Sequence, residues 1–370
     1  MSKHSTTSAW FKAALTGIVF GAGIAACGGG GGDDAAPPAP VVTSTFATAA
    51  LVADVAPAAN VDRNLVNAWG IAFNPTGFVW VANQGSSTST LYDGNGVPQT
   101  LVVAIPPGSA GAARPTGIVF NGSTDFKVTQ NGITGASPFI FVGEAGTVSG
   151  WSPAVNRTNA VTVVDTGGAA VYKGLAIANA SGANRIYATD FRNSRIDVYD
   201  AAWQKLTLPA SAFVDPNLPA GYAPFGIQAA GSRIYVTYVQ RNGAGTEEVK
   251  GAGLGLIDAY DTSGALIGRV ASGGVLNAPW GMAIAPANFG DFSNSLLVAN
   301  FGDGKINAFN PATGAFMGTL NRAANTPIVI EGLWGIAFGN GVQAQPTNVL
   351  FYTAGPGDET HGQYGRITLQ

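Results

Sequence analysis

One short motif recurs six times along this sequence, and it constrains the fold more than any other feature. The motif has a bulky or polar residue, a glycine, an aliphatic residue, a variable residue and an apolar residue. Its glycines are Gly70, Gly117, Gly174, Gly226, Gly281 and Gly335. They are spaced roughly 50 residues apart, a period that is typical of the blades of a β-propeller and longer than the repeats of helical solenoids.

Short runs rich in β-branched and aromatic residues follow each copy of the motif. After the first copy they are Val79–Ala82, Thr90–Tyr92 and Thr100–Ile105, and Asp93-Gly94-Asn95-Gly96 separates the last two. Runs of this kind, bounded by Gly, Asp and Asn, indicate strands joined by tight turns. The sequence therefore predicts an all-β protein, a six-bladed β-propeller with four-stranded blades.

The sixth repeat has no fourth strand of its own. Its third predicted strand is Gly365–Leu369, whereas a β-rich run outside the repeats, Ser44–Val52, precedes the first blade. An unpaired strand edge invites association with other chains, and propellers are built to leave few such edges. We expect the N-terminal strand to pair with the last blade and close the ring.

The scarcity of charge, cysteine and histidine excludes several classes of function. The formal net charge is −3, so the chain lacks the basic footprint that a nucleic-acid partner requires. Cys27 is the only cysteine, and His4 and His361 are the only histidines. A disulfide within the chain and a zinc site made of Cys and His ligands are therefore excluded.

Residues 1–27 have the features of an export signal. Lys3 and Lys12 supply positive charge, and the uncharged apolar run Ala13–Ala26 follows. The run leads into Ile24-Ala25-Ala26-Cys27, which resembles the lipobox of bacterial lipoproteins. The resemblance implies cleavage before Cys27 and attachment of lipid to that residue, which would hold a soluble domain at a membrane.

The domain boundaries follow from this signal. Residues 28–41 are rich in Gly and Pro and predict a tether, and residues 42–370 form the propeller. Gly28, rather than an aspartate, follows the lipidated cysteine. By analogy with lipoprotein sorting, this implies an exported protein in the cell envelope, at the outer membrane of a Gram-negative bacterium, with the membrane contacted only through the lipid anchor.

Three longer segments carry a resemblance to known propellers. They are Trp69–Ala72, Glu144–Trp151 and Asn300–Ile306, in a fixed order over residues 60–370. The pattern resembles the six-bladed NHL-repeat propellers and, more closely, an uncharacterised family of exported bacterial β-propeller proteins. The resemblance implies the fold, but it brings no functional residues with it.

Polar and aromatic residues gather where each first strand begins and each second strand ends. In a four-stranded meander these points lie on one face of the ring, around the mouth of the channel, where propellers commonly bind ligands. Caps of turns and wedges between blades would account for many of these side chains, whereas tryptophans beside Asn and Arg would also suit a carbohydrate or the end of a peptide. The candidate ligand-binding residues are Asn67, Trp69, Arg114, Lys173, Arg192, Trp280, Glu331 and Trp334.

A third interpretation of the same mouth is a metal site. Asn83, Glu144, Asp190 and Asn300 sit at equivalent places after the second strands of four blades, and carboxylate and amide oxygens are the ligands that Ca²⁺ prefers. Some six-bladed propeller lactonases use calcium in this way, so a calcium-dependent lactonase or related hydrolase is the alternative function. That alternative depends on analogy between folds.

Nucleophilic catalysis finds little support in the sequence. A Ser-His-acid arrangement would depend on His361 with Asp358 or Glu359, in a polar Gly-rich loop. The insertion Gln240–Gly253 in blade four falls on the mouth side, where it could act as a lid. We therefore expect a monomeric binding module for a small molecule, a glycan or an envelope protein. Calcium, in the alternative function, is the one cofactor that the sequence suggests.

Overall fold

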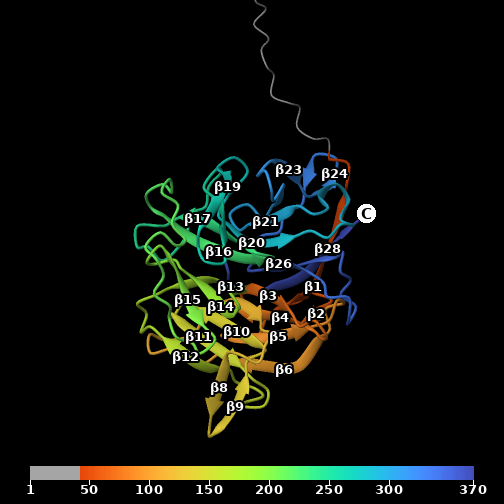
Figure 1. Ribbon diagram of the computed structural model, residues 1–370. Helices are drawn as coiled ribbons and strands as arrows, with labels where there is room; N and C mark the ends of the chain where they lie inside the picture. The colour runs from red at the N-terminus through yellow and green to blue at the C-terminus, as the bar shows by residue number, and fades with distance from the viewer. Residues whose placement is uncertain (1–41) are drawn as a thin grey trace, which may run out of the picture. The chain divides into compact units, whose positions relative to one another are not determined.

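The computed structural model describes residues 42–370, and these form six β-sheet blades around a central channel (Figure 1). This arrangement confirms the predicted all-β propeller. Each copy of the repeated motif forms the innermost strand of one blade. These first strands are β3 (Ala68–Phe73), β7 (Pro115–Phe120), β13 (Tyr172–Ala180), β16 (Tyr222–Ala230), β20 (Pro279–Ile284) and β26 (Leu333–Phe338).

The remaining strands of each blade follow the first in antiparallel order from the channel outward. Blades one and two contain β4 (Val79–Asn83), β5 (Thr88–Tyr92), β6 (Pro98–Ala104), β10 (Phe139–Gly143), β11 (Thr147–Trp151) and β12 (Val161–Asp165). Blades three and four contain β14 (Ala183–Asp190), β15 (Arg195–Asp200), β17 (Arg233–Gln240), β18 (Leu256–Asp261) and β19 (Leu266–Ser272). Blades five and six contain β21 (Leu296–Asn300), β22 (Ile306–Phe309), β23 (Phe316–Thr319), β27 (Leu350–Ala354) and β28 (Gln363–Leu369).

Blade three departs from the four-stranded plan. Its sheet contains only β13, β14 and β15, and the segment that follows joins it through a single bridge between Tyr199 and Lys205. Blade two carries an extra hairpin, β8 (Lys127–Gln130) and β9 (Ile133–Ala136), which projects from the ring in Figure 1. A second small hairpin, β24 (Asn321–Ala323) with β25 (Thr326–Pro327), precedes blade six.

The N-terminal strand closes the last blade, as the sequence predicts. Strand β1 (Phe46–Ala53) pairs antiparallel with β28, in a register that runs from Phe46 opposite Leu369 to Ala53 opposite Gln363. A further short strand, β2 (Asn60–Val61), pairs parallel to β1. The fourth strand of blade six therefore comes from the opposite end of the described chain, and this pairing locks the ring.

The glycine of the repeated motif has a steric role that is the same in all six blades. A Cβ atom placed on any of the six would lie closer than 3.0 Å to an atom in the first strand of the next blade. Gly335, for instance, faces the carbonyl oxygen of Trp69 and so brings the last blade against the first. Only a residue without a side chain permits the innermost strands to approach this closely.

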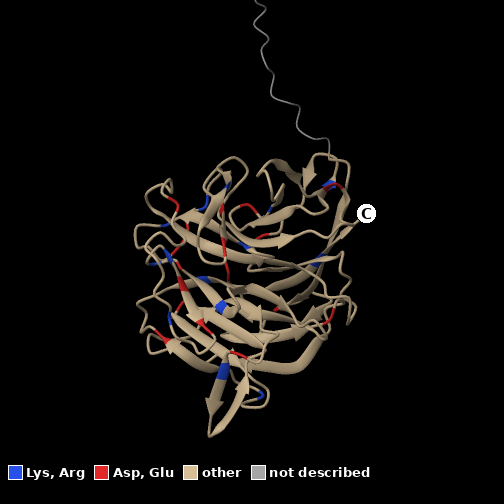
Figure 2. Ribbon diagram, viewed as in Figure 1, with Lys and Arg blue, Asp and Glu red and all other residues tan. Residues whose placement is uncertain are grey.

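Apolar side chains fill the space between neighbouring blades. One cluster joins blades five and six with β1 through Phe46, Phe292 and Ile367, and another joins blades one and two through Trp80 and Phe139. Figure 2 shows how thinly charged residues are distributed over the ribbon. The core is therefore a ring of interfaces between blades, as expected of a propeller.

The described chain begins at Val42, on the face of the ring where the first strands end. The backbone N–H groups of Thr43 and Ser44 donate to the Asp291 carboxylate at 2.7 and 2.8 Å. Asp291 lies in the short 3-10 helix η1 (Gly290–Phe292), within the turn between β20 and β21. The expected signal segment 1–27, with Cys27, and the tether 28–41 lie outside the described residues. No helix within residues 42–370 is long and apolar enough to span a membrane.

Candidate functional site

The six first strands run in the same direction along the channel, so their residues form three layers. The residue before each motif glycine lies toward one opening, the glycines form a ring in the middle, and the residues after the glycine lie toward the other opening. We call the first opening the polar mouth and the second the apolar funnel. Between the polar mouth and the glycine ring lies a cluster of rings, the aromatic plug, made of Trp69, Phe191, Phe225, Trp280, Phe301 and Trp334.

The aromatic plug is held by stacked rings from several blades. Trp69 stacks on Trp334 with centroids 3.6 Å apart, and Trp334 stacks on Phe301 at 3.7 Å. Trp280 meets both tryptophans edge-on, at 5.6 and 5.9 Å. These geometries are the favoured ones for aromatic pairs, so the plug is a packed part of the core.

The burial of the plug corrects one expectation about the mouth. Trp69 is 1% exposed and Trp334 is fully buried, so neither offers a free ring face on which a sugar could stack. Trp280 is also buried. The three tryptophans lie at one end of the channel, but they fill it instead of lining it, and their depth of burial is not visible in the sequence.

A chain of hydrogen bonds crosses the polar mouth from blade to blade. Trp334 Nε1 donates to Asn67 Oδ1 at 3.1 Å, and Asn67 Nδ2 donates to Gln84 Oε1 at 3.1 Å. Gln84 Nε2 donates to Glu144 Oε2 at 2.6 Å, and Lys173 Nζ donates to Glu144 Oε1 at 2.5 Å. Four of the six blades thus contribute to one fixed polar array that borders the plug.

The Glu144–Lys173 pair is the electrostatic centre of this array. Burial opposes charge on both groups, but each ion stabilises the other: the pKa of Glu144 lies below its usual value and the pKa of Lys173 lies above its usual value. The Lys173 ammonium also lies 4.9 Å from the centre of the Trp69 ring, a favourable cation–π distance. Both side chains are therefore charged at neutral pH.

The backbone around the mouth is held in an uncommon conformation. Asn67 and Arg114 occupy equivalent positions before the first strands of blades one and two, with φ of 46° and 47°. Asp358 and Glu359, in blade six, have φ of 55° and 68°. Residues other than glycine seldom adopt such angles, and they cluster at functional sites where the surrounding structure enforces them.

The insertion in blade four reaches over the polar mouth, where the sequence placed it. Glu247 Oε2 lies 3.5 Å from Lys173 Nζ in blade three. Lys250 Nζ lies 4.1 Å from the centre of the Phe301 ring and 4.0 Å from a carboxylate oxygen of Asp358. This loop therefore contacts blades three, five and six, as a cover over the mouth would.

Three hollows open around the mouth beneath and beside this loop. The largest two have volumes of about 550 and 460 Å³ and share Arg114 and Glu144. A third, of about 270 Å³, lies between Lys250 and Glu331. The exposed candidates Arg114, Arg192 and Glu331 line these hollows. Asn67 is a buried residue in the lining of one of them, whereas Lys173 lines none and is buried behind Glu144.

The expected calcium ligands do not occupy equivalent positions. Asn83, Asp190 and Asn300 each pair with the first-strand residue two before the motif glycine, but in blade two that place belongs to Gly143. Glu144 is one residue further along, and one step along a strand turns the side chain to the opposite face. The assumed equivalence of Glu144 with the other three is therefore wrong.

The four side chains also have hydrogen-bond partners within the protein. Asn83 Nδ2 donates to Thr88 and Thr90, Asp190 accepts from Asn193, and Asn300 Nδ2 donates to Val275 and Asp303. The Oδ1 atoms of Asn83 and Asn300 are buried without a hydrogen-bond partner among the described residues. Among residues 42–370, no group of three or more His, Cys, Asp and Glu residues is arranged to hold a metal ion. The bonds that the three strand-end residues make tie the turns that follow them, as Asn and Asp commonly do.

His361 has a partner that the sequence did not suggest. Its Nδ1 lies 2.9 Å from Asp54 Oδ2, and the Gly362 N–H donates to the other oxygen of the same carboxylate at 3.0 Å. Asp54 directly follows β1, so these bonds secure the closing strand. His361 is thus a tie between the two ends of the propeller and is not paired with Asp358 or Glu359.

No protein-family model matches the chain. The uncharacterized protein R648 of Acanthamoeba polyphaga mimivirus is 32% identical over 318 residues, which cover 84% of this chain and 76% of R648. The chain belongs to the same family as R648. A second mimivirus protein, L690, is 33% identical over 288 residues, covering 76% of this chain and 75% of L690.

These relatives refine the resemblance drawn from the sequence. The six blades of the structure confirm the propeller part of that resemblance, whereas the relatives are viral and lend no support to an exported bacterial family.

The solved structures that resemble this chain share its fold. A streptogramin B lyase aligns with a TM-score of 0.51 at 13% identity, over 88% of this chain and 98% of the lyase. A gluconolactonase from Xanthomonas campestris aligns with a TM-score of 0.51 at 12% identity, over 90% of this chain and 92% of the enzyme. A Bacteroides thetaiotaomicron protein of unknown function reaches a TM-score of 0.57 at 10% identity, over 88% and 76% of the two chains.

Proposed function

We propose that this protein is a binding module that takes a neutral carbohydrate at the polar mouth, without catalysing a reaction of its own. The observation that carries the proposal is the hydrogen-bonded array from Asn67 to Lys173. It fixes amide, carboxylate and ammonium groups from several blades at the base of hollows large enough for a small ligand.

The chemistry of the walls suits hydroxyl groups. Arg114 supplies guanidinium donors, and Glu144, Glu247 and Glu359 supply acceptors around the same hollow of about 460 Å³. Donors and acceptors placed side by side match vicinal hydroxyls, each of which both donates and accepts. The same hollow is lined by four carboxylates, Glu144, Glu247, Asp358 and Glu359, and by one guanidinium, Arg114, so it disfavours an anionic ligand.

The groups beneath the blade-four loop add to this argument. Burial raises the pKa of Glu248 and of Glu359 above the usual value for a glutamate. Glu248 Oε2 is buried without a hydrogen-bond partner among the described residues, and buried acceptors are normally satisfied. A ligand hydroxyl under the loop would satisfy it.

The test is a thermal-shift and calorimetric screen with neutral mono- and disaccharides. We expect at least one saccharide to raise the melting temperature, and Arg114→Ala and Glu359→Gln to abolish that rise. Arg322→Ala is the matched control, because Arg322 is an exposed arginine in β24, outside the mouth. If no saccharide binds, or if the two mouth variants bind as the control does, the proposal is wrong.

We also infer that the protein is exported and tethered by lipid at Cys27, on the sequence of residues 1–41. Expression in a Gram-negative host with labelled palmitate tests this. The full chain should carry the label and sediment with membranes, and Cys27→Ser should lose both properties. An unlabelled protein in the soluble fraction would contradict the tether.

A further inference from the structure

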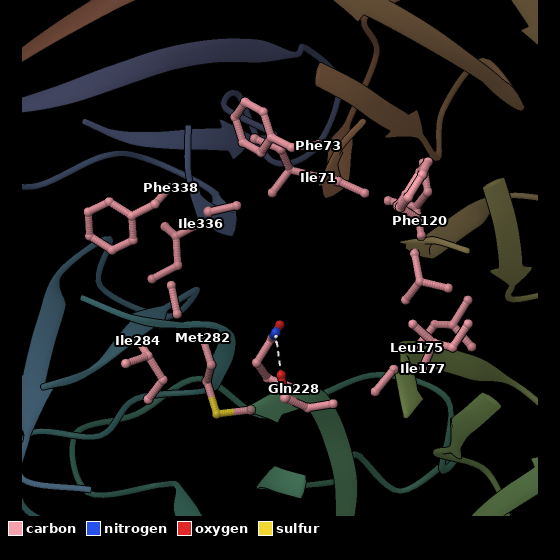
Figure 3. A pocket seen from close by; sticks show the side chains of 17 residues that line it. Ile71, Phe73, Phe120, Leu175, Ile177, Gln228, Met282, Ile284, Ile336 and Phe338 are labelled. Atoms are coloured by element: carbon pink, nitrogen blue, oxygen red, sulfur yellow. Dashed lines mark hydrogen bonds between the residues drawn. The ribbon is translucent and has the colours of Figure 1, made fainter. Parts of the chain in front are cut away.

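The opening opposite the polar mouth is a funnel whose lining side chains are almost all aliphatic or aromatic. Figure 3 shows a ring of aliphatic and aromatic side chains from all six first strands around an open centre. The funnel has a volume of about 380 Å³ and narrows to a neck of about 50 Å³ at the glycine ring. Phe73, Phe120, Gln228, Ile284 and Phe338 are among the side chains that line it.

The lining carries no charge and a single polar side chain. Gln228 is that residue, and its Nε2 donates to the carbonyl oxygen of Ala229 at 3.0 Å. The volume falls in the range of small-molecule sites. Main-chain polar groups of the first strands also face the funnel, but its side chains favour a ligand that brings hydrocarbon out of water.

The funnel has a defined shape along the channel axis. It is widest among Phe73, Phe120 and Phe338 and narrowest at the motif glycines, beyond which the aromatic plug blocks the channel. A slender chain entering end-on would bury its surface on all sides, whereas a bulky ring system would stop at the rim. This geometry favours an alkyl chain.

The path of the polypeptide indicates where such a chain would come from. Val42 packs against the cluster that contains Phe292, and Thr43 and Ser44 bond to Asp291 in the turn that directly follows the funnel residue Ile284. The described chain therefore begins on the funnel side of the propeller. The fifteen residues from Cys27 to this point span at most about 50 Å, so a lipid anchor at Cys27 would keep this face near a membrane.

We propose that the funnel binds one acyl chain of a membrane lipid, at a site separate from the polar mouth. The acyl chain enters with its methyl end first, between the phenylalanines at the rim, and extends toward the glycine ring. The headgroup remains outside the funnel. The choice of a membrane lipid over other apolar compounds rests on the proposed tether, because the tether sets which surface the funnel faces.

The test is calorimetric titration with lysophosphatidylcholines that carry octyl, decyl or dodecyl chains, each below its micelle concentration. Each buried methylene should tighten binding roughly fourfold, until the funnel is full and the gain stops. Phosphocholine alone should not bind. A free fatty acid that binds while the matching lysolipid does not would overturn the membrane-lipid source, and no binding by any chain would overturn the site.

Variants locate the site. Ile284→Asp places a charge on the funnel wall at a side chain that is 37% exposed, and Ile267→Asp is the matched control at an outer strand, where the isoleucine is 51% exposed. We expect at least a tenfold loss of lysolipid affinity in the first and none in the second. Gln228→Glu, at an exposed position, gives the same loss if Ile284→Asp folds poorly. Equal binding by all three variants would refute the funnel site, whatever the outcome of the carbohydrate screen.

Discussion

The ring of glycines makes the sharpest prediction about stability. In Gly335→Ala the new Cβ would lie 2.6 Å from the Trp69 carbonyl oxygen, 2.7 Å from Thr353 Oγ1 and 2.9 Å from Ile71 Cγ2. The Thr353 hydroxyl is itself bonded to the Trp69 carbonyl and the Gly335 N–H, so two of these three neighbours have little freedom to move. Overpacking typically costs about 1–3 kcal/mol, and we expect the upper end of that range.

The assay is thermal unfolding followed by circular dichroism. For a domain of this size, about 3 kcal/mol corresponds to a fall of roughly 4 °C in the melting temperature. Gly268→Ala is the control, since a Cβ there meets nothing within 4 Å, and restricting the unfolded chain should leave that variant at least as stable as the original. If Gly335→Ala has the same melting temperature as Gly268→Ala, the blades are not in the close contact that the fold requires.

Three further predictions concern the mouth and the closure. Lys173→Met should cost about 3–5 kcal/mol because it leaves the Glu144 carboxylate buried without its ion, and the double variant with Glu144→Gln should recover much of that loss, measured by urea unfolding. The contribution of this pair to the free energy of unfolding should be constant between pH 4.5 and 10.5. It is lost as the pH falls through the lowered pKa of Glu144, and on the alkaline side it is lost only above the usual pKa of lysine, because the pKa of Lys173 is raised. A wild-type advantage over the double variant that does not shrink as the pH falls below 4.5 would contradict the pairing. Deleting residues 1–53 should lower the melting temperature sharply, because it removes β1 and exposes the edge of β28, and an unchanged melt would refute closure by this strand.

The repeat explains why so much of the fold could be predicted. The backbones of neighbouring first strands approach so closely at six places that only glycine fits. The six regularly spaced glycines are therefore visible in the sequence. The closing strand was also predictable. The sixth repeat lacks a fourth strand, and the N-terminal β-rich run belongs to no repeat, so the two were expected to pair. The short third blade was harder to foresee, since only Lys205 marks where its missing fourth strand would lie.

The site was predictable in place but less so in detail. Asn67, Arg114 and Lys173 were found because they flank the motif, yet sequence alone does not reveal how deeply a tryptophan is buried. The misplacement of Glu144 was an error of one residue, which an alignment of the second strands on their pairing partners would have avoided. Gln84 was missed as the link to Glu144, although it occupies the matching position in blade one.

The funnel was missed for a different reason. Its lining consists of the same aliphatic residues that identify the repeat, Ile71 and Ile336 among them, and an apolar residue after the motif glycine is equally compatible with a filled core. Only the spacing of the six strands around the channel determines whether those side chains meet or leave a cavity.

The most direct test of the carbohydrate site is amide hydrogen exchange, measured by mass spectrometry with and without the saccharide that binds in the screen. The account predicts slower exchange in the blade-four loop, residues 241–251, and around Arg114, with no change at residues 282–284 and 336–338, which line the funnel. Protection confined to those funnel residues, or absent from both openings, would contradict the assignment of ligand binding to the polar mouth.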